Sequence, residues 1–309
     1  MIKEPVWTWE IPMYFYTGGL AGASAGLALL SEVQGNDVLA RRAWAVASAG
    51  IMVSPALLTS DLGRPARFLN MLRMFKVTSP MSVGSWILTL SGAATTVGAA
   101  NSLLGLFPRL GRVAKPAAAL LGLPLSTYTG ALLANTAVPV WHEARWELPL
   151  VFASGAALSA GALSVIATPP PAAGPARRLA LGGAVAELGL NEAMKKRLGP
   201  HGDPYRDGQG SAFGNLSRIG VATGAAVLAW QGQRSRLGAA LGGTLLSAGA
   251  AAARWSIFRA GFTSASDPQY VVGPQRAGIE RGTRRGAART QARVAEPDDR
   301  AGSALTAGR

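Results

Sequence analysis

The chain has 309 residues, of which 49% are hydrophobic and only 15% are charged. Soluble globular domains carry about 25% charged residues, so this composition indicates a protein that resides in lipid. The absence of cysteine excludes a thiolate-bound iron–sulfur cluster and a disulfide within this chain. The net charge is +14, but the basic residues fall between apolar runs and in the tail, as in membrane proteins, so no nucleic-acid partner is expected.

Uncharged runs long enough to cross a bilayer, about 20 residues each, recur along the chain. The fold class that they predict is an all-α integral membrane protein with about eight transmembrane helices. The expected spans are residues 12–31, 43–60, 82–106, 116–141, 148–168, 178–194, 216–232 and 237–258. No cleavable signal peptide is expected, because the N-terminus lacks a basic segment and its first apolar run is long enough to remain a span.

The segment 178–194 allows two interpretations, because it is apolar on one side only. It is either an amphipathic helix on the membrane surface or a span whose Glu187 faces the interior of the bundle. The span is favoured because it completes the topology. Charges inside a span are unfavourable and are therefore functional candidates, which makes Glu187 a candidate proton site. Arg254, near the end of the last expected span, is expected to extend toward the headgroups.

Eight spans place both termini on one side of the membrane. The basic tail and the loops on that side favour a cytoplasmic location for the termini. Two parts of the chain differ in composition, a transmembrane domain at 1–262 and a basic tail at 263–309. We expect residues 263–276 to dock on a partner or on the loops, and the chain from about 277 to be disordered.

Aromatic residues cluster where the chain enters its first span: Trp7, Trp9, Tyr14 and Tyr16. An aromatic belt at the headgroups accounts for most of them. Glu10, which lies among them, is either solvated or placed at the rim of a polar pocket.

The fourth span carries polar side chains within an apolar run. Tyr128 and Asn135 lie seven residues apart and are expected to project from the same helix face. A tyrosine hydroxyl within the bilayer requires a partner, and either a quinone carbonyl or another helix would supply one. His142 and Glu143 follow at the membrane edge, where they either relay protons or are simply solvated.

The loop between the second and third spans is long, basic and rich in apolar residues. Asp61 and Arg64 are close enough along the chain to pair, and Asp61 is a further candidate for the proton path. The spacing of Phe68 and its apolar neighbours predicts an amphipathic helix that lies either along the membrane or beneath a partner. Arg64, Arg67, Phe68 and Arg73 are the candidate docking residues.

Other cofactor chemistry has little support in the sequence. The two histidines, His142 and His201, each lie in a polar stretch between apolar runs, so a haem held by two imidazoles is not expected. Phosphate-loop, dinucleotide-binding, HExxH and nucleophile-elbow motifs are absent from the sequence. We therefore expect no hydrolytic or nucleotide chemistry from this chain.

Four segments in order resemble the NrfD/PsrC family of polysulfide-reductase-type membrane anchors: IPMYFYTGGLAG, the loop SDLGRPARFLNMLRMFKVTSPMSVGSWIL, YTGALL followed by PVWHE, and SASDPQYVVGPQR. The resemblance covers about residues 7–276. It implies two four-helix bundles without haem or cluster, and a menaquinone or ubiquinone site near a docked four-cluster ferredoxin-like subunit. That subunit connects the quinone to a molybdenum- or tungsten-bis(pterin) catalytic subunit in the cytoplasmic membrane of a prokaryote.

The resemblance also implies site residues. Tyr128 matches the tyrosine that lines the quinone pocket in the family, and Glu10 or Tyr14 stands near the position of an asparagine that some relatives carry in the first helix. The last of the four segments is more similar to anchors of formate dehydrogenases than to those of polysulfide reductases. Two alternatives remain beside a quinone-reactive subunit, namely a passive membrane tether and a proton-translocating module in which Glu187 lies on the path.

Overall fold

The computed structural model describes residues 5–62, 65–270 and 282, and within them the regular structure is entirely helical. Eight described helices have at least 20 residues and connect through short segments. They are α1 (Glu10–Val33), α2 (Asp37–Asp61), α3 (Pro80–Leu104), α4 (Pro108–Ala134), α6 (Leu148–Ala167), α7 (Gly174–Leu198), α8 (Gly208–Gln231) and α9 (Arg236–Ser266). Three short elements complete the fold: the 3₁₀ helices η1 (Pro65–Leu72) and η2 (Gly199–Tyr205), and α5 (Pro139–Glu143).

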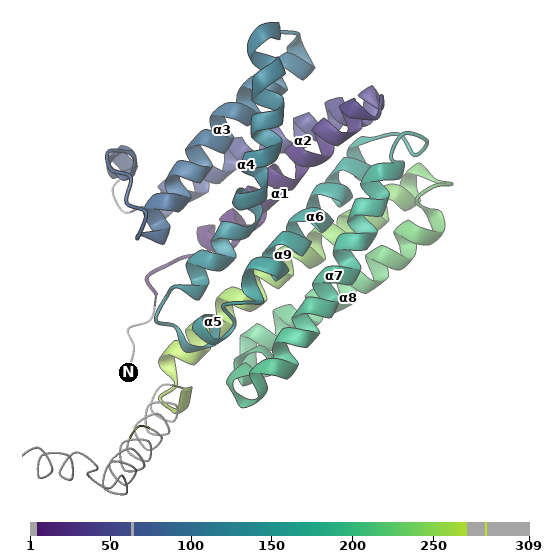
Figure 1. The fold of residues 1–309 in the computed structure, drawn as a ribbon. Helices are drawn as coiled ribbons and strands as arrows, with labels where there is room; N and C mark the ends of the chain where they lie inside the picture. Colours follow the sequence, from purple (N-terminus) through teal and green to yellow (C-terminus); the bar gives the residue numbers. More distant parts are fainter. Residues whose placement is uncertain (1–4, 63–64, 271–281, 283–309) are drawn as a thin grey trace, which may run out of the picture.

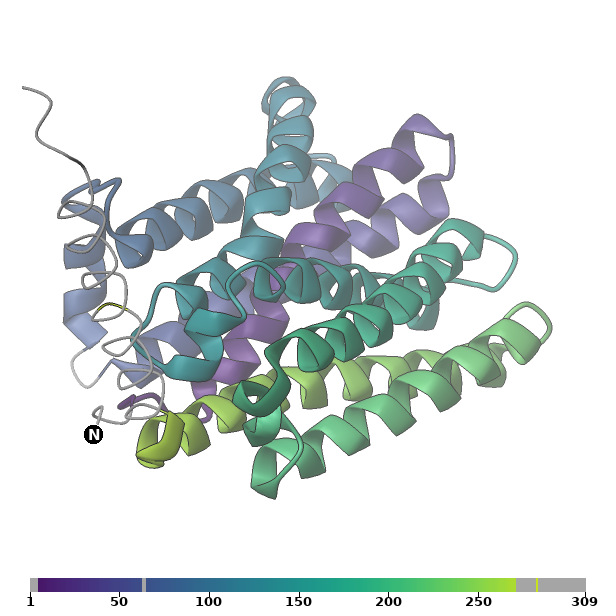
Figure 2. The same cartoon turned by 60° about the horizontal axis from the view of Figure 1, so that its bottom comes forward.

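The long helices form two four-helix bundles. Helices α1–α4 pack on one another, α6–α9 pack on one another, and the two groups meet mainly where α6 contacts α1 and α4. Figures 1 and 2 show the two bundles side by side, with the beginning of α1 and the end of α9 at the same end of the molecule. The expected two-bundle fold is thereby confirmed.

Membrane-spanning character is strong in five of the helices, α2, α3, α4, α6 and α8, which are long and apolar enough to cross a bilayer. Helices α1, α7 and α9 have comparable lengths, and α7 and α9 carry charged side chains along their course. Because all eight pack as neighbours within the two bundles, the chain is an all-α integral membrane protein.

Local signals determine where several helices begin and end. Asn36 accepts a hydrogen bond from the backbone N–H of Leu39 and so caps the start of α2, and Ser79 does the same for α3 through Ser82. Proline is tolerated in the first turn of a helix, and Pro80 occupies that position in α3. Gly105 ends α3 in the left-handed conformation that glycine adopts without steric penalty.

Glycine allows the close approach of α1 and α4. A Cβ atom built on Gly122 would lie 2.3 Å from the carbonyl oxygen of Gly22, and one built on Gly22 would lie 2.5 Å from the carbonyl oxygen of Gly122. Small residues permit this backbone contact, which holds helices together in lipid, where hydrophobic association is weak.

Several predicted helix boundaries were wrong. Helices α2, α4 and α8 begin at Asp37, Pro108 and Gly208, six to eight residues before the expected starts at 43, 116 and 216. The fourth span was expected to run to Trp141, but α4 ends at Ala134 and α5 begins separately at Pro139. Proline disfavours a helical conformation in the residue before it, and Val138 is accordingly extended. The last span was expected to end at 258, but α9 continues to Ser266.

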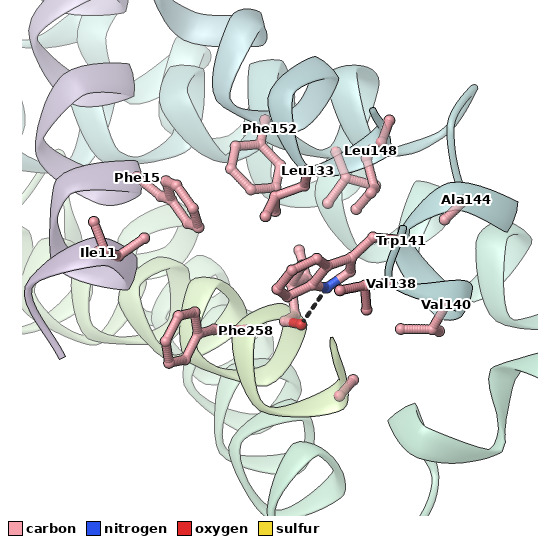
Figure 3. Packing of buried hydrophobic residues seen from close by; sticks show 14 of the residues in the cluster. Ile11, Phe15, Leu133, Val138, Val140, Trp141, Ala144, Leu148, Phe152 and Phe258 are labelled. Carbon is pink, nitrogen blue, oxygen red and sulfur yellow. Dashed lines mark hydrogen bonds between the residues drawn. The ribbon is translucent and has the colours of Figure 1, made fainter. Parts of the chain in front are cut away.

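Trp141, on α5, joins the two bundles at the end of the molecule where the chain begins. Its indole is fully buried and donates a hydrogen bond of 2.9 Å to the carbonyl oxygen of Ile257 on α9. It also stacks on Trp7, with 5.9 Å between the ring centroids. Figure 3 shows the indole surrounded by apolar side chains that include Phe15 and Phe258. This contact fixes the segment that precedes α1 and so prepares the site described next.

Candidate functional site

A pocket of about 320 Å³ lies within the first bundle, at the end where α1 begins. Residues from α1, α2, η1, α3 and α4, and from the segment before α1, surround it. The lining residues are Val6, Trp7, Ile11, Tyr14, Phe15, Leu58, Asp61, Leu62, Met71, Met81, Gly84, Ser85, Tyr128 and Leu132. Ligand sites are typically concave and apolar with a few convergent polar groups, and this lining has that composition.

Tyr14 supplies a buried polar group to the pocket. Its side chain is 2% exposed, and its hydroxyl has no hydrogen-bond partner among the described residues. Buried hydroxyls are nearly always hydrogen-bonded, because leaving one unpaired is unfavourable. Tyr14 therefore lines the pocket and has a donor that is not used within the described part of the chain.

Tyr128 supplies the second phenol. Its ring, from α4, lies directly against the backbone of Gly84 on α3, where a Cβ atom would be only 2.4 Å from Cε2 of the ring. A glycine at this position therefore provides the space that the ring occupies. The pocket brings Tyr14 and Tyr128 together, although 114 positions separate them in the sequence.

The rim of the pocket carries two carboxylates joined by one hydroxyl. Asp61 accepts hydrogen bonds from the hydroxyl of Thr8, at 2.7 Å, and from its backbone N–H, at 3.2 Å. The same hydroxyl contacts a carboxylate oxygen of Glu10. A threonine hydroxyl has a single proton to donate. The hydroxyl can therefore donate to only one of the two carboxylates at a time, and the trio Glu10–Thr8–Asp61 connects the pocket to the beginning of α1.

Thr8 was not among the predicted site residues. Nothing in the sequence marks it, because a single threonine before a helix is ordinary. Its position depends on Trp7, which stacks on Trp141, and on Asp61 at the far end of α2. Only the folded chain brings these three residues together.

Other predicted site residues lie outside the pocket. Asn135 is exposed at the end of α4, where its amide donates to the carbonyl oxygen of Ala131. His142 is exposed on α5, and its Nδ1 lies 3.2 Å from the carbonyl oxygen of Ala134. Glu143, next to it, is half-buried. These residues lie near the same end of the molecule but do not line the pocket.

The predicted docking residues surround η1. Arg73 is exposed just after η1, whereas Phe68 is half-buried within it. Arg64 lies outside the described residues, as does the side chain of Arg67, so the predicted pair of Arg64 with Asp61 stays a prediction. The predicted helix in this loop is present as the 3₁₀ helix η1.

A buried ion pair occupies the second bundle. Glu187 on α7 and Arg254 on α9 are 1% and 2% exposed, with 3.8 Å between Oε1 and Nη1. Nη2 of Arg254 also donates to the carbonyl oxygen of Phe152, at 3.1 Å, and its guanidinium lies over the Phe152 ring. Arg254 was expected to extend toward the headgroups, and that prediction was wrong because α9 continues well past it. Glu187 faces the interior of the bundle, as the favoured interpretation predicted.

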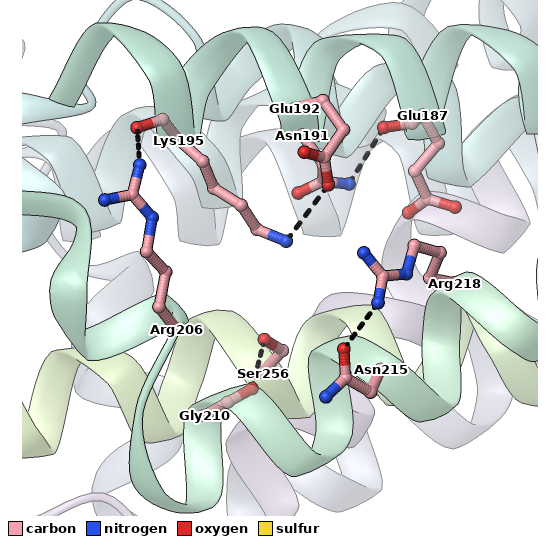
Figure 4. Close-up of polar contacts among 9 residues, drawn as sticks. All are labelled: Glu187, Asn191, Glu192, Lys195, Arg206, Gly210, Asn215, Arg218 and Ser256. Atoms are coloured by element: carbon pink, nitrogen blue, oxygen red, sulfur yellow. Dashed lines mark hydrogen bonds and ion pairs between the residues drawn. The ribbon is translucent and has the colours of Figure 1, made fainter. Parts of the chain in front are cut away.

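Polar side chains continue from this ion pair toward the end of α7. Figure 4 shows them between α7, α8 and α9, with Lys195 bound to Glu192 and the amide of Asn191 donating to the backbone of Glu187. A small cavity lies among these side chains, and Tyr205, in η2, lines it and has a buried hydroxyl. Burial raises the pKa of Tyr205 above its ordinary value, so its hydroxyl stays protonated near neutral pH.

The two bundles and their apolar helices define an integral membrane protein, and its first bundle contains a mainly apolar pocket lined by two phenols. Comparison with known families identifies it further, because the model of the NrfD family, described as polysulphide reductase, NrfD, matches residues 1–179. The match covers more than half of the chain, which therefore belongs to the NrfD family, and family membership makes it a membrane subunit of a redox complex. No curated protein matches the chain. The matched region contains every residue that lines the pocket.

Proposed function

We propose that the chain is the quinone-binding subunit of a multi-subunit oxidoreductase and that the quinone ring binds in the pocket of the first bundle. The observation that carries this proposal is the unpartnered hydroxyl of Tyr14, a residue that lines the same mainly apolar pocket as Tyr128. A ring carbonyl would accept the hydrogen bond that Tyr14 does not make within the chain. The alternative of a passive tether gives no reason for an unpaired phenol at this position.

The pocket fits a quinone in chemistry as well as in size. Apolar side chains such as Ile11, Phe15 and Leu132 would cover the faces of a ring and exclude water, while Tyr14 and Tyr128 would orient its oxygens. A bound menaquinone or ubiquinone supplies chemistry that couples two electrons to two protons. The protein supplies the hydrogen bonds and the proton path.

Protons would reach or leave the pocket through the trio Glu10–Thr8–Asp61. Asp61 lines the pocket, and Thr8 connects it to Glu10 at the beginning of α1. Because the Thr8 hydroxyl contacts both carboxylates, it would connect Asp61 in the pocket with Glu10 outside it. His142 and Glu143 would extend this path at the same end of the molecule.

Electrons would come from or pass to a partner, because the chain has no cysteine to hold a cluster. We propose that a four-cluster ferredoxin-like subunit docks at the end of the molecule that holds the pocket, with Arg73 and the loop 60–81 in the contact. A molybdenum- or tungsten-bis(pterin) subunit, of the formate dehydrogenase type, would complete the complex. The site of action would be the cytoplasmic membrane of a prokaryote, with the termini of this chain in the cytoplasm.

The decisive experiment measures quinone turnover by the purified complex after removal of each phenol hydroxyl. We expect Tyr14→Phe and Tyr128→Phe each to lower turnover by up to about tenfold, since loss of a hydrogen bond of about 1.4 kcal/mol corresponds to a tenfold lower rate. Tyr16→Phe is the matched control, because Tyr16 lies on the same helix but its hydroxyl pairs with Ser247 on α9. Unchanged turnover in both pocket variants, with no quinone bound to the native complex, would favour a passive tether.

A second function, proton translocation coupled to the redox step, is favoured by the buried pair Glu187–Arg254. Buried charges within a membrane protein are unfavourable and mark candidate ion or proton paths. The polar side chains between α7, α8 and α9 would connect this pair to the end of the molecule that holds the pocket. Proteoliposomes that contain the complex with Glu187→Gln test this function. We expect quinone turnover to continue while acidification or alkalinisation of the lumen is lost.

A further inference from the structure

We infer that a groove between α2 and α3 binds the isoprenoid tail of the quinone, an inference that rests on the proposed function. The groove has a volume of about 280 Å³ and lies beneath η1. Its lining residues are Ile51, Met52, Pro55, Phe68, Leu72, Leu88, Thr89, Gly92, Ala93 and Thr96. It shares no residue with the pocket for the ring, so it would form a second part of the ligand site.

The groove begins where the pocket ends on both long helices. On α3, Gly84 and Ser85 line the pocket, and Leu88 and Thr89 of the next turn line the groove. Residues three or four apart lie on the same face of a helix, one turn apart. On α2, Leu58 lines the pocket in the same way, and Pro55, three residues earlier, lines the groove. The pocket and the groove therefore follow one another along the same two helices.

The 3₁₀ helix η1 covers the junction between them. Met71 lines the pocket, while its neighbour Leu72 and Phe68 line the groove. A ligand that leaves the pocket along α2 and α3 would therefore pass beneath η1. Covering the ligand would explain why η1 carries apolar residues. Neither a solvated loop nor a docking surface would require apolar residues at these positions.

The chemistry of the groove fits a hydrocarbon chain. None of the described residues that line it is charged, and Thr89 and Thr96 are the polar ones among them. It also opens outward, because Met52 is 72% exposed and Ala93 is exposed. From Ser85 to Thr96 the path would extend about 16 Å at ~1.5 Å per residue, roughly half of the ~30 Å hydrocarbon thickness.

Small side chains on α3 keep the groove open. A Cβ atom built on Gly92 would lie 3.5 Å from Cγ1 of Ile51, which is ordinary contact, so any larger side chain there would extend into the groove. Ala93, next to it, is exposed along the same path. A bulky residue at 93 would occupy the groove without displacing packed neighbours, which makes it the better test.

The test compares quinones with and without a tail on the full-length chain in its complex. The affinities of menaquinone-4 and menadione, and of ubiquinone-4 and ubiquinone-0, are measured from the quenching of tryptophan fluorescence, because Trp7 lines the pocket. We expect Ala93→Phe to weaken the binding of the tailed member of each pair about tenfold and to leave the tail-free member unchanged. Loss of contact for as few as two methylene groups gives a change of this size.

The matched control is Leu90→Phe, on the same helix. Leu90 is exposed but does not line the groove, so this variant is expected to bind both quinones as the native protein does. Equal weakening of menaquinone-4 binding by both variants would overturn the inference, because the effect would then not depend on the groove. Unchanged binding of the tailed quinones to Ala93→Phe, with a phospholipid retained in the groove in native mass spectrometry, would also overturn it.

Failure of the proposed function gives a different result. If the native complex binds none of the four quinones, the ring site itself is wrong, and the inference about the tail is overturned with it. If menadione or ubiquinone-0 binds and its affinity depends on Tyr128, but the tailed quinones gain nothing from the groove, the ring site stands and only the tail site is wrong.

Discussion

Tyr128 occupies the space that a side chain at Gly84 would fill, with 2.4 Å between a Cβ atom built at position 84 and Cε2 of the ring. The position of the phenol on α4 is thus determined by a glycine on α3. A residue that touches no ligand can therefore set the direction of the hydroxyl proposed to bind the quinone.

Gly84→Ala is accordingly predicted to displace the Tyr128 ring. Displacements of about 1 Å can lower a rate about 100-fold, so we expect quinone turnover to fall about 10- to 100-fold. Gly26→Ala is the control, because no atom lies within 4 Å of a Cβ built on Gly26. A Gly84→Ala complex with native turnover and native quinone affinity would show that the orientation of Tyr128 does not matter.

Thr8 is predicted to be required for proton transfer because its hydroxyl joins Glu10 and Asp61. Thr8→Val keeps the shape of the side chain but removes the hydroxyl, and we expect turnover to fall about tenfold or more, since positioned proton transfer typically contributes 10²- to 10⁴-fold. Thr8→Ser restores the hydroxyl and should restore most of the rate. The measurement is quinone turnover by the two variant complexes and the native complex under the same conditions. Equal rates for the two variants would contradict the prediction.

The pair Glu187–Arg254 is predicted to couple α7 and α9. Glu187→Gln leaves the guanidinium of Arg254 buried without its counter-charge, and breaking such a pair typically removes about 3–5 kcal/mol of stability. We expect a clearly lower Tm in detergent, followed by near-ultraviolet circular dichroism.

The double variant Glu187→Leu, Arg254→Met removes both charges and is expected to recover much of the lost Tm. Replacement of a buried pair by apolar residues of similar volume is often neutral or stabilising. A double variant that is less stable than Glu187→Gln would indicate that the hydrogen bond of Arg254 to Phe152, rather than the pair, carries the effect.

The helices could be predicted from sequence because lipid imposes one strong rule, a long run without charge. That rule fails at helix ends. There the chain has left the hydrocarbon region, so a helix can continue through charged residues and a charge no longer marks the helix end. The predicted last span stopped at 258, close to Arg259, although α9 continues to Ser266. Arg254 was therefore predicted to lie near the end of its helix, where the side chain could reach the headgroups. In the structure α9 continues to Ser266, so Arg254 lies in the interior of the helix and cannot reach them.

Only some residues of the candidate pocket could be predicted from the sequence. Tyr128 could be named because a polar group is conspicuous within an apolar run, and Asp61 because it ends such a run. Tyr14 could be named only from the resemblance to the NrfD/PsrC family. Seven-residue spacing also placed Asn135 on the face of Tyr128, but the helix ends at Ala134, so the periodicity no longer applies there. Thr8 and Gly84 act through contacts between segments distant in sequence, and no local pattern predicts such contacts.

The junction of the bundles gives a final prediction, which concerns Trp141 and Gly261. A Cβ atom built on Gly261 would lie 2.0 Å from Cζ2 of the buried indole, so Gly261→Ala forces either the tryptophan or α9 to move. Overpacking of this kind typically removes about 1–3 kcal/mol of stability, and Tm should fall. Gly189→Ala, where no atom lies within 4 Å of the added Cβ, is the control and should keep the native Tm.

A smaller ring should relieve the clash, so Trp141→Phe in the Gly261→Ala background is expected to recover part of the lost Tm. Because Trp141 stacks on Trp7, which lines the pocket, Gly261→Ala should also weaken quinone binding although it lies in the second bundle. A lower Tm with native quinone affinity would show that the junction stabilises the fold without positioning the segment before α1.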